Sequence, residues 1–192
     1  MRRAQLIEAG LELLGTDSTL SVVAVIAQSG LAPRYFYDEF SSLDALQLAV
    51  FDSLVEEAER RALRALERVG MDQKARVRTR AVLDEMLAFI FDDPRRGHVL
   101  LIASVGSPIL GPRRERELRR LAELMAFHAL GSTKSTPRPR PATVSATFAM
   151  GGFAEVVASA LQNPATINPE QIADDLTALF VECSRVATRL KP

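Results

Sequence analysis

The feature that most constrains the fold is a group of four aromatic residues beside a tight turn, in the segment GLAPRYFYDEF (residues 30–40). Gly30 can adopt the positive φ angle that a sharp turn needs, and Pro33 suits the first turn of a helix. Ser21 is a good N-cap for a short helix over residues 22–29, which Gly30 would end. Two short helices joined by a glycine turn are typical of a helix-turn-helix motif.

The aromatic side chains of this segment are expected to divide between a core and an outer face. A helix over residues 3–14 precedes the two short helices and gives them an apolar face to pack against. The side chains expected in the small core are Ile26, Leu31, Phe36 and Phe40. Arg34, Tyr35 and Tyr37 then remain on the other faces of the third helix. Because a phenol donates to phosphate and an arginine bonds guanine or phosphate, these three residues are candidate DNA contacts.

Helical periodicity continues through the 192-residue chain and predicts an all-α fold with about nine helices. Ser41, with Asp44 three positions on, resembles a capping box that opens a long helix ending near Gly70. Further helices are expected over residues 72–92, 95–106, 113–130, 142–162 and 169–190. The segment GSTKSTPRPRPA (131–142) has prolines at alternate positions and predicts a flexible or extended linker.

Composition excludes several classes of protein. No run of 18 uninterrupted apolar residues occurs, so no membrane span is expected, and Glu8 and Glu12 argue against an N-terminal signal peptide. Cys183 is the single cysteine, so an intramolecular disulfide is excluded and a cytoplasmic location fits. Two histidines and one distant cysteine give no metal-ligand spacing. Since no catalytic arrangement or phosphate-binding glycine loop is visible, we expect neither an enzyme nor a cofactor.

The segment SVVAVIAQSGLAPRYFYDEFSSLDALQLAV resembles the N-terminal domain of the TetR family of bacterial transcriptional regulators. The resemblance covers residues 3–54, and the matching positions are Ser21, Val22, Ile26, Ala27, Gly30, Leu31, Tyr37, Phe40, Ser42, Leu46 and Val50. It implies a helix-turn-helix DNA-binding domain over residues 1–46 and a helical effector-binding and dimerisation domain over 47–192. The DNA contacts expected from the motif and the resemblance are Ser21, Arg34, Tyr35, Tyr37 and Ser42.

Four positions depart from the family pattern. Glu39 stands where a histidine is frequent, Leu43 where a phosphate-binding lysine is usual, Asp38 adds an acid, and Ala32 replaces a serine cap. Residues 1–55 carry 3 basic and 7 acidic side chains, a net charge of −4. Because most non-specific affinity comes from cations that meet phosphates, we expect weak DNA binding with a shallow salt dependence. A helix-turn-helix kept only as a structural platform therefore stays open as an alternative.

The last two helices carry apolar stripes on more than one face, so one face can serve the core and the other a partner. The resemblance implies a symmetric homodimer in which two helices of each subunit form a four-helix bundle. The expected interface residues are Phe153, Val157, Leu161, Ile172, Leu176, Leu179, Cys183 and Val186. The alternative is that both stripes are internal core.

Large apolar residues and two histidines in the middle helices are candidates for an effector site. They are Met86, Phe89, Ile90, His98, Leu101, Phe127, His128 and Phe148. Taken with the resemblance, they predict a dimeric repressor that binds a palindromic double-stranded operator and is released by a small apolar effector. The alternative is a TetR-fold protein that binds a small molecule or a partner and has weak or lost DNA binding.

Overall fold

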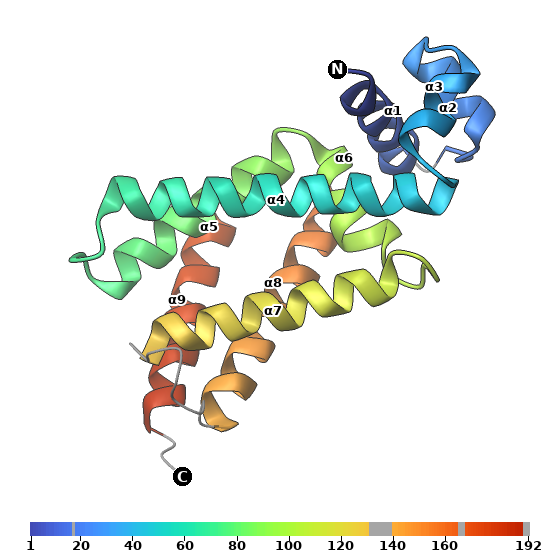
Figure 1. Cartoon of the computed structure of the whole chain (residues 1–192). Helices are drawn as coiled ribbons and strands as arrows, with labels where there is room; N and C mark the ends of the chain where they lie inside the picture. Colours follow the sequence, from blue (N-terminus) through green and yellow to red (C-terminus); the bar gives the residue numbers. More distant parts are fainter. Residues whose placement is uncertain (17, 131–139, 165–167, 190–192) are drawn as a thin grey trace. The chain divides into compact units, whose positions relative to one another are not determined.

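The computed structural model describes residues 1–16, 18–130, 140–164 and 168–189, and these residues form helices joined by turns (Figure 1). The all-α expectation is confirmed. The helices of the described residues are α1 (Arg2–Gly15), α2 (Val22–Ser29), α3 (Pro33–Glu39), α4 (Leu43–Val69), α5 (Ala75–Phe91), α6 (Pro94–Gly97), the π-helix η1 (His98–Ala103), α7 (Gly111–Leu130), α8 (Arg140–Gln162) and α9 (Pro169–Arg189).

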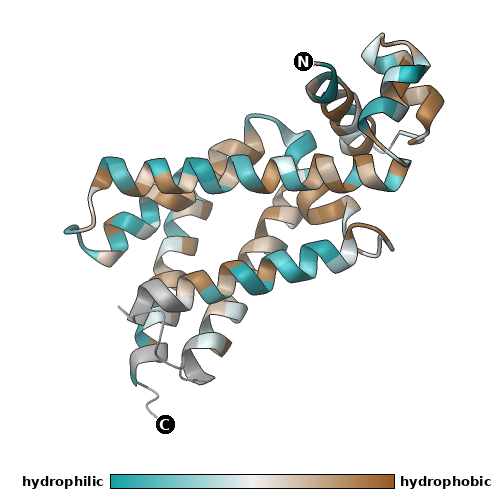
Figure 2. Cartoon of the chain, viewed as in Figure 1, coloured by the Kyte–Doolittle hydropathy of each residue, from teal (hydrophilic) through white to brown (hydrophobic). Residues whose placement is uncertain are grey.

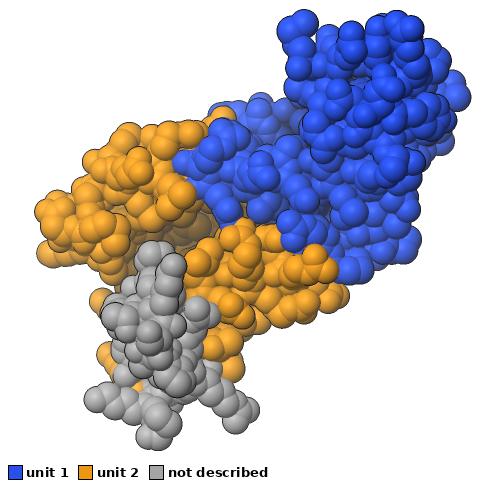
Figure 3. All heavy atoms as spheres, viewed as in Figure 1, with its two compact units in different colours: residues 1–60, 89–114 blue, residues 61–88, 115–192 orange. Residues whose placement is uncertain are grey.

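The chain divides into two compact units, which Figure 3 colours separately. Unit 1 comprises residues 1–60 and 89–114, and unit 2 comprises residues 61–88 and 115–192. Each of the long helices α4, α5 and α7 therefore contributes residues to both units. The division between a DNA-binding and an effector-binding domain after residue 46 stays a prediction.

Local capping explains where the first helices begin and end. The Ser21 hydroxyl accepts a hydrogen bond from the Ala24 amide at 3.1 Å, and Gly30 ends α2 with φ of 66°. Both features were expected from the sequence. The predicted cap at Ser41 is wrong by one position, because the Ser42 hydroxyl accepts from the Ala45 amide at 3.1 Å. Since α4 begins at Leu43, only Ser42 has the N-cap place from which it can bond the third helical amide.

The core of unit 1 forms where α1 packs against α2, α3, α6 and η1. In Figure 2, α1, α2 and η1 are brown over much of their length, the colour of apolar residues. Phe36 and Phe40 are buried, as expected, whereas Ile26 and Leu31 are only half-buried. Val25 is the fully buried residue of α2, so the sequence prediction placed the inward face of that helix one residue too late.

The predicted helix over residues 95–106 is a composite element. α6 covers four residues and continues into η1, whose hydrogen bonds follow the wider π-helical pattern. Val99 is completely buried in η1, and Phe89 and Leu110 are also buried in unit 1. The periodicity of an apolar segment predicts that it is helical, but it does not separate an α-helix from a π-helix.

Unit 2 contains the packed pair α8 and α9. Val157, Leu176 and Ala160 are buried, and the rings of Phe153 and Phe180 meet edge to face with centroids 6.4 Å apart. α8 begins at Arg140, so the last three residues of the predicted linker are helical. The rest of that linker, residues 131–139, lies outside the described residues.

One described helix, over Thr143–Gln162, is long and apolar enough by length and composition to cross a membrane. Soluble helices that contribute to a core pass the same test, so the finding is weak evidence for a span. Only 33% of its most apolar window is buried within the single chain. Part of its apolar surface is therefore uncovered by the described residues of this chain.

Candidate nucleic-acid interface

The aromatic residues of α3 have opposite environments. Phe36 is 0% exposed and Phe40 is 3% exposed, whereas Tyr37 is 65% exposed. The Tyr37 ring rests edge to face on Phe36, with centroids 5.3 Å apart. Its hydroxyl makes no hydrogen bond within the described part of the chain. α3 therefore presents a phenol on a rigid base, with the hydroxyl available to an external acceptor such as a phosphate oxygen.

Three arginines surround α3. Arg34 donates to the Tyr35 hydroxyl at 2.8 Å, and its guanidinium carbon lies 4.7 Å from the centre of the Tyr35 ring. The guanidinium carbon of Arg2 lies 3.9 Å from the same ring centre. Arg3 lies 4.4 Å from the centre of the Phe40 ring and donates to the Glu39 carbonyl oxygen at 3.0 Å. These are all the basic residues of the first 55, so every cation of this segment lies against α3.

Several acidic residues of the same segment are held by cations from later in unit 1. Arg95 contacts Glu8 at 3.1 Å and Glu12 at 2.5 Å, and Arg113 contacts Asp52 at 2.7 Å. The net charge of −4 therefore overstates the acidity next to α3. Charge counted along a sequence does not show which acids are already paired.

Ser21 and Ser42 each use the hydroxyl as an acceptor for a backbone amide of their own helix. Ser21 is half-buried and Ser42 is exposed. Each stands at a helix N-terminus, where unpaired amides favour anions. Their assignment as DNA contacts stays a prediction.

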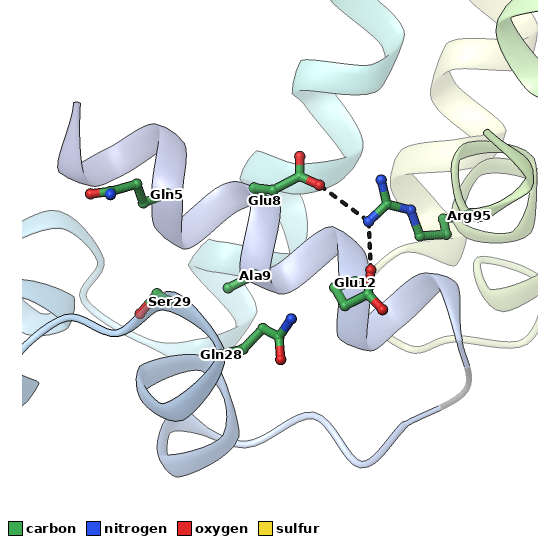
Figure 4. A pocket seen from close by; sticks show the side chains of 7 residues that line it. All are labelled: Gln5, Glu8, Ala9, Glu12, Gln28, Ser29 and Arg95. Atoms are coloured by element: carbon green, nitrogen blue, oxygen red, sulfur yellow. Dashed lines mark hydrogen bonds and ion pairs between the residues drawn. The ribbon is translucent and has the colours of Figure 1, made fainter. Parts of the chain in front are cut away.

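A shallow hollow of about 400 Å³ lies in unit 1 between α1, α2 and Arg95 (Figure 4). It is lined by Gln5, Glu8, Ala9, Glu12, Gln28, Ser29 and Arg95. The Arg95 guanidinium reaches Glu8 and Glu12 across it, as the dashed lines show, and also bonds Asp93 at 2.8 Å. The side-chain hydrogen bond from Arg95, with the positive charges of Arg95 and Arg96, holds the pKa of Asp93 below its ordinary value. The hollow is thus crossed by a structural ion-pair cluster.

The predicted effector residues are distributed over both units. Phe89 and Ile90 are buried in unit 1, where His98 and Leu101 are half-buried in η1. The guanidinium carbon of Arg96 lies 4.8 Å from the centre of the Phe89 ring. The predicted residues in unit 2 are Met86, Phe127, His128 and Phe148.

Among these unit 2 residues, Met86 is half-buried and Phe148 is 72% exposed on α8. Phe127 and His128 lie in the last turns of α7, and their side chains are outside the described part of the structure. A single effector pocket formed by the predicted residues stays a prediction.

The predicted interface residues also divide by burial. Val157, Ile172 and Leu176 are buried within the single chain. Phe153, Leu161 and Cys183 are half-buried, and burial raises the pKa of the Cys183 thiol. Leu179 is 56% exposed and Val186 is 43% exposed. Only the exposed and half-buried members are available to a second chain.

The described residues include no group of three or more histidine, cysteine, aspartate or glutamate side chains that could hold a metal ion. The charged groups that are close together in this part of the chain are ion pairs, such as Arg80 with Asp84 at 2.6 Å. The most developed surface feature with a defined chemistry is thus the aromatic and cationic face of α3.

Comparison with solved structures identifies the fold. The chain is similar to a transcriptional regulator from Rhodococcus sp. Rha1, with a TM-score of 0.77, 17% identity and coverage of 95% of this chain and 96% of that one. It is similar to a TetR-like transcriptional regulator from Rhodococcus sp. RHA1, with a TM-score of 0.72, 21% identity and coverage of 93% of each chain.

The transcriptional regulator FadR from Bacillus subtilis, solved in complex with stearoyl-CoA, gives a TM-score of 0.71 at 15% identity, with coverage of 93% of this chain and 97% of that one. Neither a protein-family model nor a curated protein matches the sequence. The similarity extends over nearly the whole of each chain. The protein therefore has the fold of the TetR-like transcriptional regulators.

Proposed function

We propose that the protein is a transcriptional repressor that binds a palindromic operator as a homodimer and releases it when a small apolar effector binds. The observation that carries the proposal is the helix-turn-helix of unit 1. Its third helix buries Phe36 and Phe40 and exposes Tyr37 and Arg34. An exposed recognition helix fixed by a buried aromatic pair is suited to the major groove. The fold shared with transcriptional regulators supports this reading.

The homodimer is proposed from the uncovered apolar surface of α8 and α9. The exposed apolar residues of these helices are Val144, Phe148, Val156, Leu179 and Val186. Gly151 and Gly152 lie on α8 among them and are exposed, with no atom within 4 Å of the place of a Cβ. A second copy would cover this surface, and the glycines would allow close approach of its helices. In this proposal Phe148 belongs to the dimer interface and not to an effector pocket.

The operator test is an anisotropy titration on the promoter DNA next to the protein's own gene, with random duplex of equal length as the reference. The wild type should bind the promoter at least tenfold more tightly than random DNA, a difference of about 1.4 kcal/mol. Tyr37→Ala should remove that preference, whereas Arg34→Ala should weaken binding to both duplexes, because Arg34 is proposed to contact phosphate. Equal affinity for both duplexes in the wild type would contradict the proposal.

The effector test is thermal melting with a panel of apolar ligands, because a ligand that binds only the folded state must stabilise it. Long-chain acyl-CoA belongs in the panel, since the structurally similar FadR was solved with stearoyl-CoA. An effector should raise the melting temperature and lower operator affinity in the same concentration range. A ligand that stabilises the protein without changing operator affinity would contradict the release mechanism.

The second candidate is a TetR-fold binding protein that does not regulate DNA and is not an enzyme. The observation that favours it is the excess of acidic residues in residues 1–55, with Leu43 at the usual place of a lysine. It predicts weak and equal binding to promoter and random duplex, together with stabilisation by a ligand. The two titrations above therefore separate the candidates.

A further inference from the structure

We propose that Tyr35 is a positioning residue that holds the guanidinium groups of Arg2 and Arg34 for contact with two phosphates of duplex DNA, while Tyr37 is the tyrosine that contacts the groove directly. This inference rests on the proposed function. The sequence analysis gives both Tyr35 and Tyr37 as DNA contacts, whereas this inference gives the two tyrosines different roles. It also makes Arg2, at the other end of the three-helix motif in the sequence, part of the DNA-binding face.

The contacts of Tyr35 within the chain support a positioning role. Its ring has guanidinium carbons at 3.9 Å and 4.7 Å from its centre, from Arg2 and Arg34, and its hydroxyl accepts from Arg34 at 2.8 Å. Tyr35 is half-buried. A tyrosine with both its ring and its hydroxyl engaged has less of its surface left for a base or a phosphate.

Tyr37 provides the contrast two residues further on. It is 65% exposed, and among the described residues its one aromatic contact is the ring of Phe36 and its hydroxyl makes no hydrogen bond. Its hydroxyl can therefore meet a phosphate or a base edge without breaking an internal bond.

The two arginines are available to an anion. Neither Arg2 nor Arg34 has a carboxylate partner within the described part of the chain, and both are exposed. A guanidinium that stacks on an aromatic face keeps its edge N–H groups free to donate, which is the geometry used for phosphate. Stacking also reduces the side-chain entropy that each arginine would lose on binding.

The pair supplies two of the three basic side chains in this segment. Leu43 stands where a lysine would begin α4, and the first 55 residues contain three basic side chains in all. Two of the three lie on one ring. The geometry thus concentrates a small number of cations at one edge of α3, where a phosphate backbone would pass if this helix entered the major groove.

The first experiment examines the cluster without DNA. The chain has two tyrosines and no tryptophan, so Tyr37→Phe leaves Tyr35 as the single source of intrinsic fluorescence. In this background, adding Arg2→Ala and Arg34→Ala together should raise the acrylamide quenching constant, because the Tyr35 ring loses the two guanidinium groups that shield it from solvent. Arg76→Ala, which removes an exposed arginine of α5, is the matched control and should leave quenching unchanged. Unchanged quenching in the double variant would overturn the inference.

The second experiment measures the salt dependence of binding to random duplex, where the charge of the phosphates dominates. Each of Arg2→Ala and Arg34→Ala should make the negative slope of log K against log salt shallower, by about 0.9 for each phosphate that is no longer neutralised. Tyr35→Ala should make the slope shallower as well, although it removes no charge. Tyr35→Phe keeps the ring and should keep the Arg2 contribution. Arg76→Ala should leave the slope at its wild-type value.

The outcomes distinguish this inference from the proposed function. A wild type that binds duplex with a slope unaffected by both arginine variants overturns the inference alone. A slope that becomes shallower for the arginine variants but not for Tyr35→Ala also overturns it, since the arginines would then act without the ring. A wild type that binds no duplex overturns the proposed function and the phosphate role together, and the quenching result still decides whether Tyr35 holds the two guanidinium groups.

Discussion

At the scale of single residues, Phe36 and Tyr37 are neighbours in the sequence with opposite roles. Phe36 is fully buried, so Phe36→Ala should lower the free energy of unfolding by about 3–5 kcal/mol. Tyr37→Ala at an exposed position should change it by only about 0.5 kcal/mol. Urea denaturation followed by circular dichroism measures both values. Equal costs for the two substitutions would mean that α3 does not present its faces as described.

Gly15 is a residue whose place requires the absence of a side chain. A Cβ at this position would stand 2.4 Å from the Arg95 Cβ and 2.8 Å from the Arg95 Cα, inside any permitted contact. Gly15→Ala should therefore destabilise the protein by about 1–3 kcal/mol, despite the better helix propensity of alanine. Gly111→Ala is the control, because its nearest neighbour would be the Ser104 carbonyl oxygen at an ordinary 3.5 Å. Thermal melting that shifts equally for both variants would refute the close approach.

At the scale of elements, Arg95 ties α6 to α1 through carboxylates, and this tie has a definite pH dependence. Asp93 has its pKa lowered in the folded state, principally by the hydrogen bond from Arg95. A carboxyl whose pKa is lowered on folding stabilises the folded protein at pH values above its ordinary pKa of 3.8. That stabilisation is lost as the pH falls through the pKa of the folded state.

The difference in unfolding free energy between the wild type and Asp93→Asn should accordingly shrink as pH is lowered from about 5 to about 3. Denaturant titrations at several pH values measure this difference. Asp92→Asn changes the exposed neighbour, which makes no ion pair among the described residues, and should give a nearly constant difference. A difference for Asp93→Asn that grows on acidification would reverse the expected sign.

Helix ends illustrate how far the sequence predicts elements. Gly30 and Ser21 were predicted correctly because each has a strong local reason for its place, a positive φ angle and a side-chain cap. Ser41 and Ser42 are adjacent residues of the same type, so the pattern could not decide which of them caps α4. Val25 and Ile26 are likewise both apolar, and the packing of α2 on α1 decides which is buried.

At the scale of the whole molecule, the exposed apolar face of α8 and α9 predicts self-association. The wild type should sediment with twice the 21.0 kDa mass of one chain. Leu179→Glu places a charge on the proposed interface at a residue 56% exposed in the single chain, and it should shift the protein toward a monomer. Sedimentation velocity over a concentration series measures the shift.

Val105→Glu is the matched control for this prediction. Val105 is 61% exposed, but it belongs to unit 1 and not to α8 or α9. The variant should therefore sediment as the wild type does. A wild type that stays monomeric, or a Leu179→Glu variant that stays dimeric, would contradict the proposed interface.

The candidate site as a whole was only partly accessible to sequence reasoning. Tyr37, Phe36 and Phe40 could be assigned to their faces, because helical spacing fixes direction within one short helix. The stacking of Arg2 on Tyr35 could not be predicted, since it joins residues 33 positions apart through the packing of α1 on α3. The pairing of Glu8 and Glu12 with Arg95 was missed for the same reason.

The π-helix η1 contains one more residue in its hydrogen-bonded turn than an α-helix would. η1 follows the π-helical pattern, in which a carbonyl accepts from the amide five residues on, one more than in an α-helix. Removing a single residue between His98 and Ala103 would let the segment rewind as ordinary helix, with its two ends kept close to their present places. Shortening the chain here should therefore be tolerated better than the same deletion in the middle of α8, where every later side chain would turn by about 100°.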